Sequence, residues 1–406
     1  MGKEVPHQQG GAYSGPPQGL LAEVLRHALS RGGDRADVFL EHKVSLSLRL
    51  EDGKVEEALS GVDVGGSVRI IRGLSTRFGY VDAVEEAALL RLADDLARSD
   101  AGVPPNSIAT RSSLLMLSAG HEGTEQWQGR SQGRGSERDD HRFSRARLAA
   151  TWLRLVDEEA RAQSAEVRQV TAAFGESLQR VWMADSSEVM ASDTRVRKML
   201  AVTVMAQRGS LIQVGRETLA LREEGLDFEE AAVVTLARVA AQKALAMLDS
   251  RPAPGGRMAV VLAKGFGGVL FHEACGHGLE ADYILKKASV WEGRIGQRVA
   301  GDHVFAYDDG ADAGLWGSAL VDDEGVPSRR TTLIEGGVLT GYLTDRLRAV
   351  HLGLPLSGNG RRQDFRHLPY PRMTNTYFGP GSHHPEEIIA DTPYALYAKS
   401  LSGGQV

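Results

Sequence analysis

A proline- and glycine-rich segment, "RPAPGG" at residues 251–256, separates two parts of this sequence that have different patterns. Before it, segments with the spacing of amphipathic helices alternate with strand-like segments, which predicts α/β structure. After it, glycine- and aspartate-rich turns separate short strand candidates, as in residues 321–343, which predicts a β-rich domain. A chain of 406 residues is too long for one small core, so we expect an α+β fold divided at this segment.

The part before the segment divides further into two predicted α/β modules, residues 19–99 and 147–250. In the first module, leucines at helical spacing predict an opening helix. The alternating segment 44–50 predicts a strand, and "EDG" at 51–53 predicts the turn that follows it. A second helix is expected over residues 83–99.

The second module is expected to begin with a helix over residues 147–163 and to end with a long helix over 227–250. Asp227 is a candidate N-cap for that last helix, because a side-chain oxygen at this position can accept from the first free backbone N–H groups. The domain after the boundary, residues 255–406, is predicted to start with a short buried strand, "MAVVLA" at 258–263.

Two further segments are too polar for a packed core. Residues 1–18 are rich in glycine, proline and glutamine, and we expect them to form a disordered tail. Residues 100–146 are predicted to be a linker, because the polar, arginine-rich stretch 117–145 has no sustained period. That stretch is locally basic but mixed in sign and poor in aromatic residues, so a solvated loop is favoured over nucleic-acid contact.

The composition restricts the compartment and the partners. The formal net charge of −6 gives no electrostatic reason to expect nucleic acid. The lone cysteine, Cys275, excludes an internal disulfide and fits a reducing compartment. The first residues lack the apolar core of a secretory signal, and we find no apolar run of about 18 residues that predicts a membrane span. We therefore expect a cytoplasmic protein that does not bind membranes.

The segment "GFGGVLFHEACGHGLEAD", residues 265–282, contains two histidines and a glutamate within six positions. In H-E-x-x-H zinc peptidases the histidines are four residues apart and share one helical face. His272 and His277 are five apart, which places them roughly 140° apart on an ideal helix. Both can bind one metal only if the helix breaks, ends or bulges between them, and Gly276 is a residue type that permits such a departure.

The same residues also allow interpretations that involve no metal. Glu273 and His277 are also four apart and can pair across a helix end, while His272 can be a hydrogen-bonded core histidine. Cys275 can ligate a soft metal such as zinc, but a lone cysteine is more often a small apolar residue. If a metal is present, Glu273 is placed to accept a proton from attacking water and to deliver it to the leaving amine.

Further blocks of the C-terminal part are distinctive together with the histidine segment. They are "FHEACGHGLEAD" (271–282), "GRIGQRVA" (293–300), "DDEGVPSRRTTLIEGGVLTGYLTDRL" (322–347), "SGNGRR" (357–362), "PRMTNTYF" (371–378), "PEEII" (385–389) and "GGQV" (403–406). These blocks resemble the TldD branch of the TldD/PmbA metallopeptidase family, once called modulators of DNA gyrase. The N-terminal stretch 33–73 also resembles the first module of that family.

The resemblance implies an H-E-x-x-x-H zinc peptidase that acts on small or unfolded peptides. His272 and His277 match the zinc-ligand histidines, and Glu273 matches the catalytic glutamate. It further implies an N-terminal α/β part, a β-rich C-terminal part, and a dimer around an enclosed chamber. The block 371–378 offers strand edges with which an extended peptide can pair.

The sequence departs from the family pattern in one way that affects the metal site. The family normally continues for several dozen residues beyond "GGQV", and its third zinc ligand is a cysteine in that segment. The domain over 255–406 is therefore expected to be incomplete, with exposed strand edges. Cys275, Asp282 and His303 are candidate substitute ligands.

Two other functions stay open on this basis. One is a non-catalytic partner subunit or degenerate homologue without a complete metal site, which would assemble with a related chain. The other is a zinc site with a purely structural role. As partners we expect an unstructured peptide substrate and either a second copy of this chain or a PmbA-like chain.

Overall fold

The computed structural model describes residues 16, 18–99, 113–114, 135–222, 227–265 and 267–400. Nearly all of the predicted tail, most of the predicted linker and the terminal "GGQV" lie outside the described residues.

A seven-stranded sheet forms the N-terminal half, in the order β4-β3-β2-β1-β5-β6-β7. All its neighbouring strands are antiparallel except β3 and β4, which are parallel. The strands of the two predicted modules belong to this one sheet, because β1 pairs with β5 along almost its whole length. The strands are β1 (Arg35–Glu51), β2 (Lys54–Arg72), β3 (Ser75–Val81), β4 (Ser113–Leu114), β5 (Val167–Asp185), β6 (Met190–Arg208) and β7 (Leu211–Leu221).

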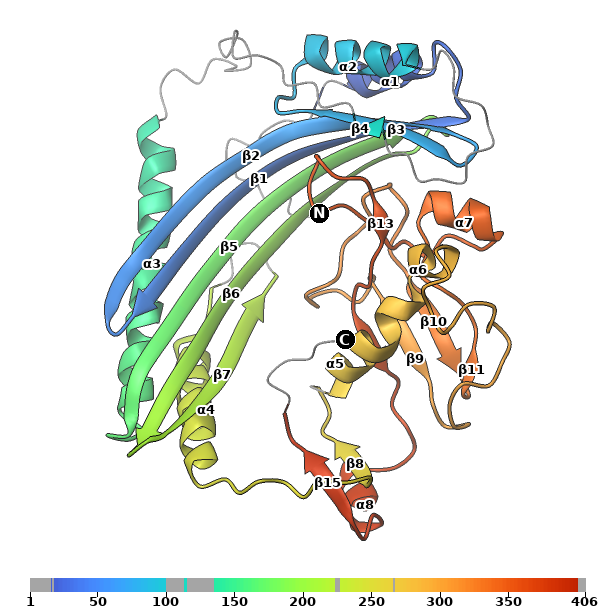
Figure 1. Cartoon of the computed structure of the whole chain (residues 1–406). Helices are drawn as coiled ribbons and strands as arrows, with labels where there is room; N and C mark the ends of the chain where they lie inside the picture. Colours follow the sequence, from blue (N-terminus) through green and yellow to red (C-terminus); the bar gives the residue numbers. More distant parts are fainter. Residues whose placement is uncertain are drawn as a thin grey trace, which may run out of the picture.

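Four helices cover the convex face of this curved sheet (Figure 1). Helices α1 and α2 pack on one end of the sheet, and α3 and α4 pack on the other. Successive side chains of a strand alternate between faces, so Val38 and Leu40 of β1 join the core under α1 and α2, while Phe39 faces the concave side. The helices are α1 (Gln18–Ala28), α2 (Glu86–Arg98), α3 (Gly135–Arg161) and α4 (Glu230–Leu248).

Two helix starts differ from the sequence-based predictions. Helix α3 begins at Gly135, so residues 135–146 are helical where we predicted linker. Helix α4 has Glu229 at its N-cap position. The Asp227 carboxylate accepts instead from Arg145 Nη1 at 2.6 Å and Lys198 Nζ at 3.3 Å, so it ties the start of α4 to its neighbours without capping it.

Helix α4 is the one helix in the described ranges whose length and apolar composition would suffice to cross a membrane. Its buried side packs against β6 and β7, as expected for a core helix. We therefore assign its apolar residues to the core between α3, α4 and the sheet.

The C-terminal half lies on the concave side of the sheet and consists of short elements joined by turns (Figure 1). Strands β11, β10, β9 and β14 form a four-stranded sheet, β12 pairs with β13, and β15 pairs with β8 in parallel. The strand predicted at 258–263 is present as β8, but it is not buried, since Val260 is 51% exposed. The strands are β8 (Ala259–Leu262), β9 (Ala306–Asp309), β10 (Arg330–Glu335), β11 (Val338–Leu339), β12 (Gly360–Arg361), β13 (Tyr370–Pro371), β14 (Thr376–Phe378) and β15 (Ala395–Ala398). The helices are α5 (Gly267–Phe271), α6 (Ala281–Leu285), α7 (Arg346–Leu352) and α8 (Pro385–Ala390).

Buried ion pairs join the concave face of the sheet to the C-terminal half. Arg69 of β2 donates to Asp37 of β1 at 2.6 Å and to Glu324 at 2.5 Å. Arg195 of β6 donates to Asp323 at 2.6 Å. All of these side chains are less than 10% exposed, so separating the two halves would leave unpaired buried charges.

Candidate metal centre

The residues between α5 and α6 form one π-helical turn, His272–Gly276, followed by a 3₁₀ turn, His277–Leu279. The backbone N–H of His277 donates to the carbonyl of His272, which is the i to i+5 bond of a π turn. A π turn holds one residue more than an α turn, so it brings residues five apart close to the same face. The bulge that the histidine spacing requires is therefore present.

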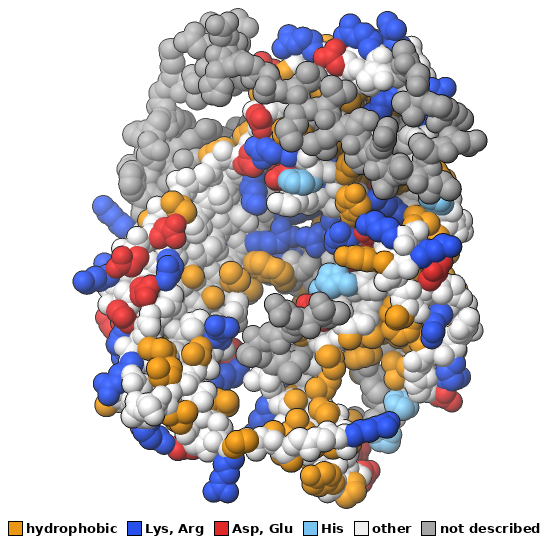
Figure 2. Space-filling model, viewed as in Figure 1, with side chains coloured by type: hydrophobic (Ala, Val, Ile, Leu, Met, Phe, Trp, Pro, Cys, Tyr) orange, Lys and Arg blue, Asp and Glu red, His pale blue; other side chains and the backbone are white. Residues whose placement is uncertain are grey.

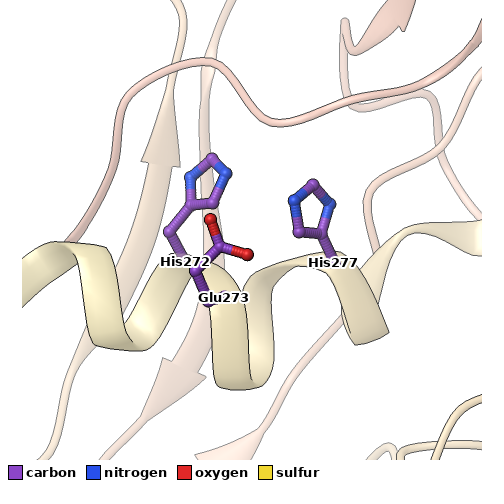
Figure 3. Close-up of side chains that lie close together, drawn as sticks. All are labelled: His272, Glu273 and His277. Atoms are coloured by element: carbon purple, nitrogen blue, oxygen red, sulfur yellow. The ribbon is translucent and has the colours of Figure 1, made fainter. Parts of the chain in front are cut away.

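The side chains of His272, Glu273 and His277 project on the same side of this turn (Figure 3). Their candidate ligand atoms all lie within 4.8 Å of one another. The two imidazole rings have centroids 4.8 Å apart and planes at 87°. All three side chains are half-buried, so solvent and a ligand can reach them.

Gly276 has a different reason to be glycine from the one we predicted. Its φ of −56° is ordinary right-handed backbone, so the turn does not require the conformational freedom of glycine. A Cβ at this position would instead lie 2.2 Å from Sδ of Met373. Gly276 therefore permits close packing between the π turn and the segment before β14.

Glu280 is a site residue that sequence reasoning missed. Its Oε1 lies 3.3 Å from Nδ1 of His277, and its Oε2 accepts from Nη1 of Arg372 at 2.9 Å. When Glu280 is ionised it only accepts, which places the hydrogen on Nδ1 of His277 and leaves Nε2 for a metal. The side chain is buried, and burial raises the pKa of Glu280 to about 7, against the opposing effects of Arg372 and His277. The only sequence signal was an acidic residue three positions after a histidine.

His272 is held in the form that binds metals. Burial and the neighbouring His277 lower the pKa of His272, and they outweigh the nearby carboxylates of Glu273 and Asp308. A neutral imidazole has a free lone pair for a metal ion, and a protonated one does not. Asp308 is fixed near this ring by hydrogen bonds from the backbone N–H and hydroxyl of Thr374, at 2.8 and 2.7 Å.

The two interpretations without a metal, a Glu273–His277 pair and a core histidine at 272, fit this geometry less well than a metal site does. Within the described residues, His277 pairs with Glu280 and not with Glu273. Within the described ranges, no group donates a hydrogen bond to the side chain of Glu273. The side chain of His272 likewise forms no hydrogen bond there and is only half-buried, so it is not a core histidine. Two imidazoles and a free carboxylate on one accessible face are a donor set that fits a divalent metal ion.

The three candidate substitute ligands do not join this group in the part of the chain that the structure describes. Cys275 packs against the apolar cluster around Phe271, and burial raises the pKa of its thiol. Asp282 accepts from Lys286 at 3.3 Å and from Arg372 at 3.4 Å. The ring of His303 lies against Gly301.

Comparison with known proteins relates three regions of the chain to one family. Models of the PmbA/TldA metallopeptidase family match residues 36–99 (domain 1), 144–248 (central domain) and 255–406 (C-terminal domain). A metalloprotease TldD homolog of Haemophilus influenzae is 34% identical over 394 residues, covering 95% of this chain and 78% of that protein. A metalloprotease of Methanothermobacter thermautotrophicus is 30% identical over 392 residues, covering 91% and 77%.

Solved structures have the same fold at lower sequence identity. TldE from Thermococcus kodakarensis superposes with a TM-score of 0.70 at 16% identity, covering 95% of this chain and 83% of that chain. A putative modulator of DNA gyrase from Thermotoga maritima gives 0.70 at 17% identity, covering 94% and 82%.

Proposed function

The chain belongs to the PmbA/TldD metallopeptidase family, and from this premise we propose that it is a zinc-dependent peptidase that hydrolyses small or unfolded peptides. The observation that carries the proposal is the π turn, which places His272, Glu273 and His277 on one accessible face with their ligand atoms within 4.8 Å.

In this proposal His272 and His277 hold the metal through neutral imidazoles. Zinc suits nitrogen ligands, and its Lewis acidity makes water a nucleophile near neutral pH and polarises the scissile carbonyl. Glu280 fixes the ring of His277 from the side opposite to the metal-binding nitrogen, and Arg372 holds Glu280 in place.

Glu273 is the proposed general base. Its carboxylate receives no hydrogen bond within the described ranges, so it is free to accept a proton from the attacking water. The same carboxyl group then returns the proton to the leaving amine. Its side chain lies on the same side of the turn as the two histidines (Figure 3), as this role requires.

The proposed substrates are extended peptides, because an edge strand of a sheet lies near the turn. β14 is an edge strand of its four-stranded sheet. It lies beside α5, the helix that leads into the π turn, since a Cβ on Gly268 of α5 would be 3.9 Å from the carbonyl oxygen of Thr376. An extended peptide can pair with such an edge through backbone hydrogen bonds. Cytoplasmic location and assembly into a dimer, with a second copy or a PmbA-like chain, belong to this proposal.

One observation favours the alternative, a partner subunit without catalytic activity. In the described ranges no third histidine, cysteine or aspartate joins His272 and His277.

The test is cleavage of unstructured peptides, followed by mass spectrometry, after the protein has been loaded with zinc. Glu273→Gln keeps the shape of the side chain and removes the base, so we expect a rate at least ~100-fold lower with bound zinc unchanged. Glu292→Gln, which alters an exposed glutamate, is the control and should retain the rate. Absence of cleavage by the zinc-loaded unaltered chain would support the partner-subunit alternative.

A further inference from the structure

Three arginines from separate elements gather on the concave side of the long sheet. Arg197 is on β6, Arg222 follows β7, and Arg361 is on β12. All three side chains are half-buried. None of them forms an ion pair with a carboxylate in the described part of the chain, whereas Arg195 and Arg362 nearby do.

Contacts with two loop segments hold these arginines in place. Arg222 Nη1 donates to the carbonyls of Leu315, at 3.0 Å, and of Ser318. The guanidinium carbon of Arg197 lies 5.9 Å from the ring centroid of Trp316. Arg361 Nη1 donates to the carbonyl of Met373 at 3.1 Å. These bonds use backbone oxygens, which orient the guanidinium groups without neutralising their charge.

Within the described residues, the positive charge of this group is compensated only in part, by the charges of Asp323 near Arg197 and of Asp193 near Arg222. Burial lowers the pKa of Arg197 to about 10, and the charges of Arg361, Arg195 and Arg222 act in the same direction. Both of these carboxylates are also paired with Arg195, at 3.0 Å for Asp193 and 2.6 Å for Asp323. Three cations that lie together without an ion pair of their own among the described residues repel one another, and such a group is suited to bind an anion.

The arginine group lies next to the candidate metal centre. The residue whose carbonyl accepts from Arg361 is Met373, and its Sδ would lie 2.2 Å from a Cβ on Gly276 of the π turn. The next residue, Thr374, holds Asp308 beside His272. Figure 2 shows Lys and Arg side chains gathered at the centre of this face, close to a histidine.

We propose that Arg197, Arg222 and Arg361 form an anion subsite that binds a carboxylate of the peptide substrate, a proposal that rests on the proposed peptidase function. Guanidinium groups match the two oxygens of a carboxylate and bind it more strongly than neutral donors do. The carboxylate comes either from the C-terminus of the peptide or from an aspartate or glutamate side chain. Nucleic acid is disfavoured, because the net charge is −6 and the group has one aromatic neighbour, Trp316.

The experiment measures binding and not cleavage, so that it is independent of catalysis. The protein is the full chain with Glu273→Gln, and the probe is an N-terminally fluorescein-labelled octapeptide of glycine, alanine and serine with a free C-terminus. Fluorescence anisotropy compares four peptides: this one, its C-terminal amide, an amide with one internal glutamate, and an amide with one internal glutamine at the same position. We expect the free carboxylate to bind at least about tenfold more tightly than the amide.

The Arg361→Gln and Arg197→Gln variants should lose this preference, while the exposed Arg294→Gln control should keep it. A preference for the internal glutamate peptide over its glutamine counterpart would support the subsite and assign the carboxylate to a side chain. Equal binding of all four peptides, or binding of none, would overturn the subsite even if the arginine variants fail to fold. If the unaltered chain binds no zinc or cleaves no peptide but the carboxylate preference is observed, the proposed function is refuted and the anion subsite is not.

Discussion

The contact between His277 and Glu280 shows how one buried carboxylate can determine which nitrogen of a histidine faces a metal. Glu280 lies on the Nδ1 side of the ring and is anchored by Arg372, 92 positions later in the chain. Carboxylate partners of this kind fix the orientation of ligand histidines and raise their basicity. Sequence reasoning identified the candidate ligands but not this support, because the spacing does not indicate that Arg372 folds back onto Glu280.

We expect Glu280→Gln to weaken zinc binding about 10- to 100-fold, because the neutral amide removes the closer carboxylate partner of Arg372 and no longer polarises His277. The affinity is measured by competition with a chromophoric chelator. Asp282→Asn is the matched control, since Asp282 also contacts Arg372 but does not contact His277. Equal zinc affinities for Glu280→Gln and the unaltered chain would refute the role of Glu280.

A second prediction at this scale concerns Asp322, a carboxyl group buried where the two halves meet. Burial, and then the neighbouring charge of Glu324, raise the pKa of Asp322 to about 8. The folded chain therefore keeps a proton that the unfolded chain releases between about pH 4 and pH 8. The contribution of this group to stability is complete below about pH 4 and is lost as the pH rises through about 8.

The Asp322→Asn variant tests this sign. We expect the free energy of unfolding of the unaltered chain, minus that of the variant, to decrease from about pH 5 to about pH 8. Urea denaturation followed by circular dichroism at several pH values measures this difference. A difference that does not change with pH, or that grows, would contradict the raised pKa.

At the scale of elements, the π turn converts an unusual histidine spacing into a usable site. The five-residue spacing predicted that an ordinary helix would not suffice, and the structure has a π turn at this position. The spacing could not indicate which departure from the α-helix occurs. Nor could it indicate that Gly276 is required by contact with Met373, because that contact joins segments far apart in the sequence.

Changes in the length of the turn test this interpretation. Deletion of Ala274 leaves the histidines four apart, so an α turn would again place them on one face, and we expect zinc binding to persist. Insertion of one alanine after Ala274 moves His277 by roughly 100°, and we expect zinc binding to be lost. Zinc content is measured for both variants, with circular dichroism as the folding control. Loss in both, or retention in both, would contradict the π-turn account.

For the whole molecule, local patterns predicted the α+β architecture better than the long-range pairing. The hairpin turn at 51–53 and the helix within 83–99 were predicted correctly, since each depends on neighbouring residues. The single sheet was not predicted, because β1 pairs with β5 more than a hundred positions away. The start of α3 at Gly135 was also missed, as its first turns are polar and lack an apolar period.

The arrangement of the whole molecule places the proposed chemistry between a curved sheet and the C-terminal half that its concave face holds. Phe39, Val181, Met183 and Phe365 form an apolar contact there, beside the buried ion pairs of Arg69 and Arg195. The arginine group depends on this junction, because Arg197 comes from the sheet and Arg361 from the C-terminal half, which also carries His272, Glu273 and His277. The position of Arg197 relative to the candidate metal centre is therefore fixed by the same contacts that stabilise the fold.

The most direct measurement is the zinc content of the purified chain, determined by elemental analysis after reconstitution and dialysis. We predict about one zinc ion per chain, its loss in the His272→Ala, His277→Ala double variant, and its retention in His303→Ala, which alters a histidine outside the site. No zinc in the unaltered chain, or as much zinc in the double variant, would contradict the claim that this π turn holds a catalytic metal.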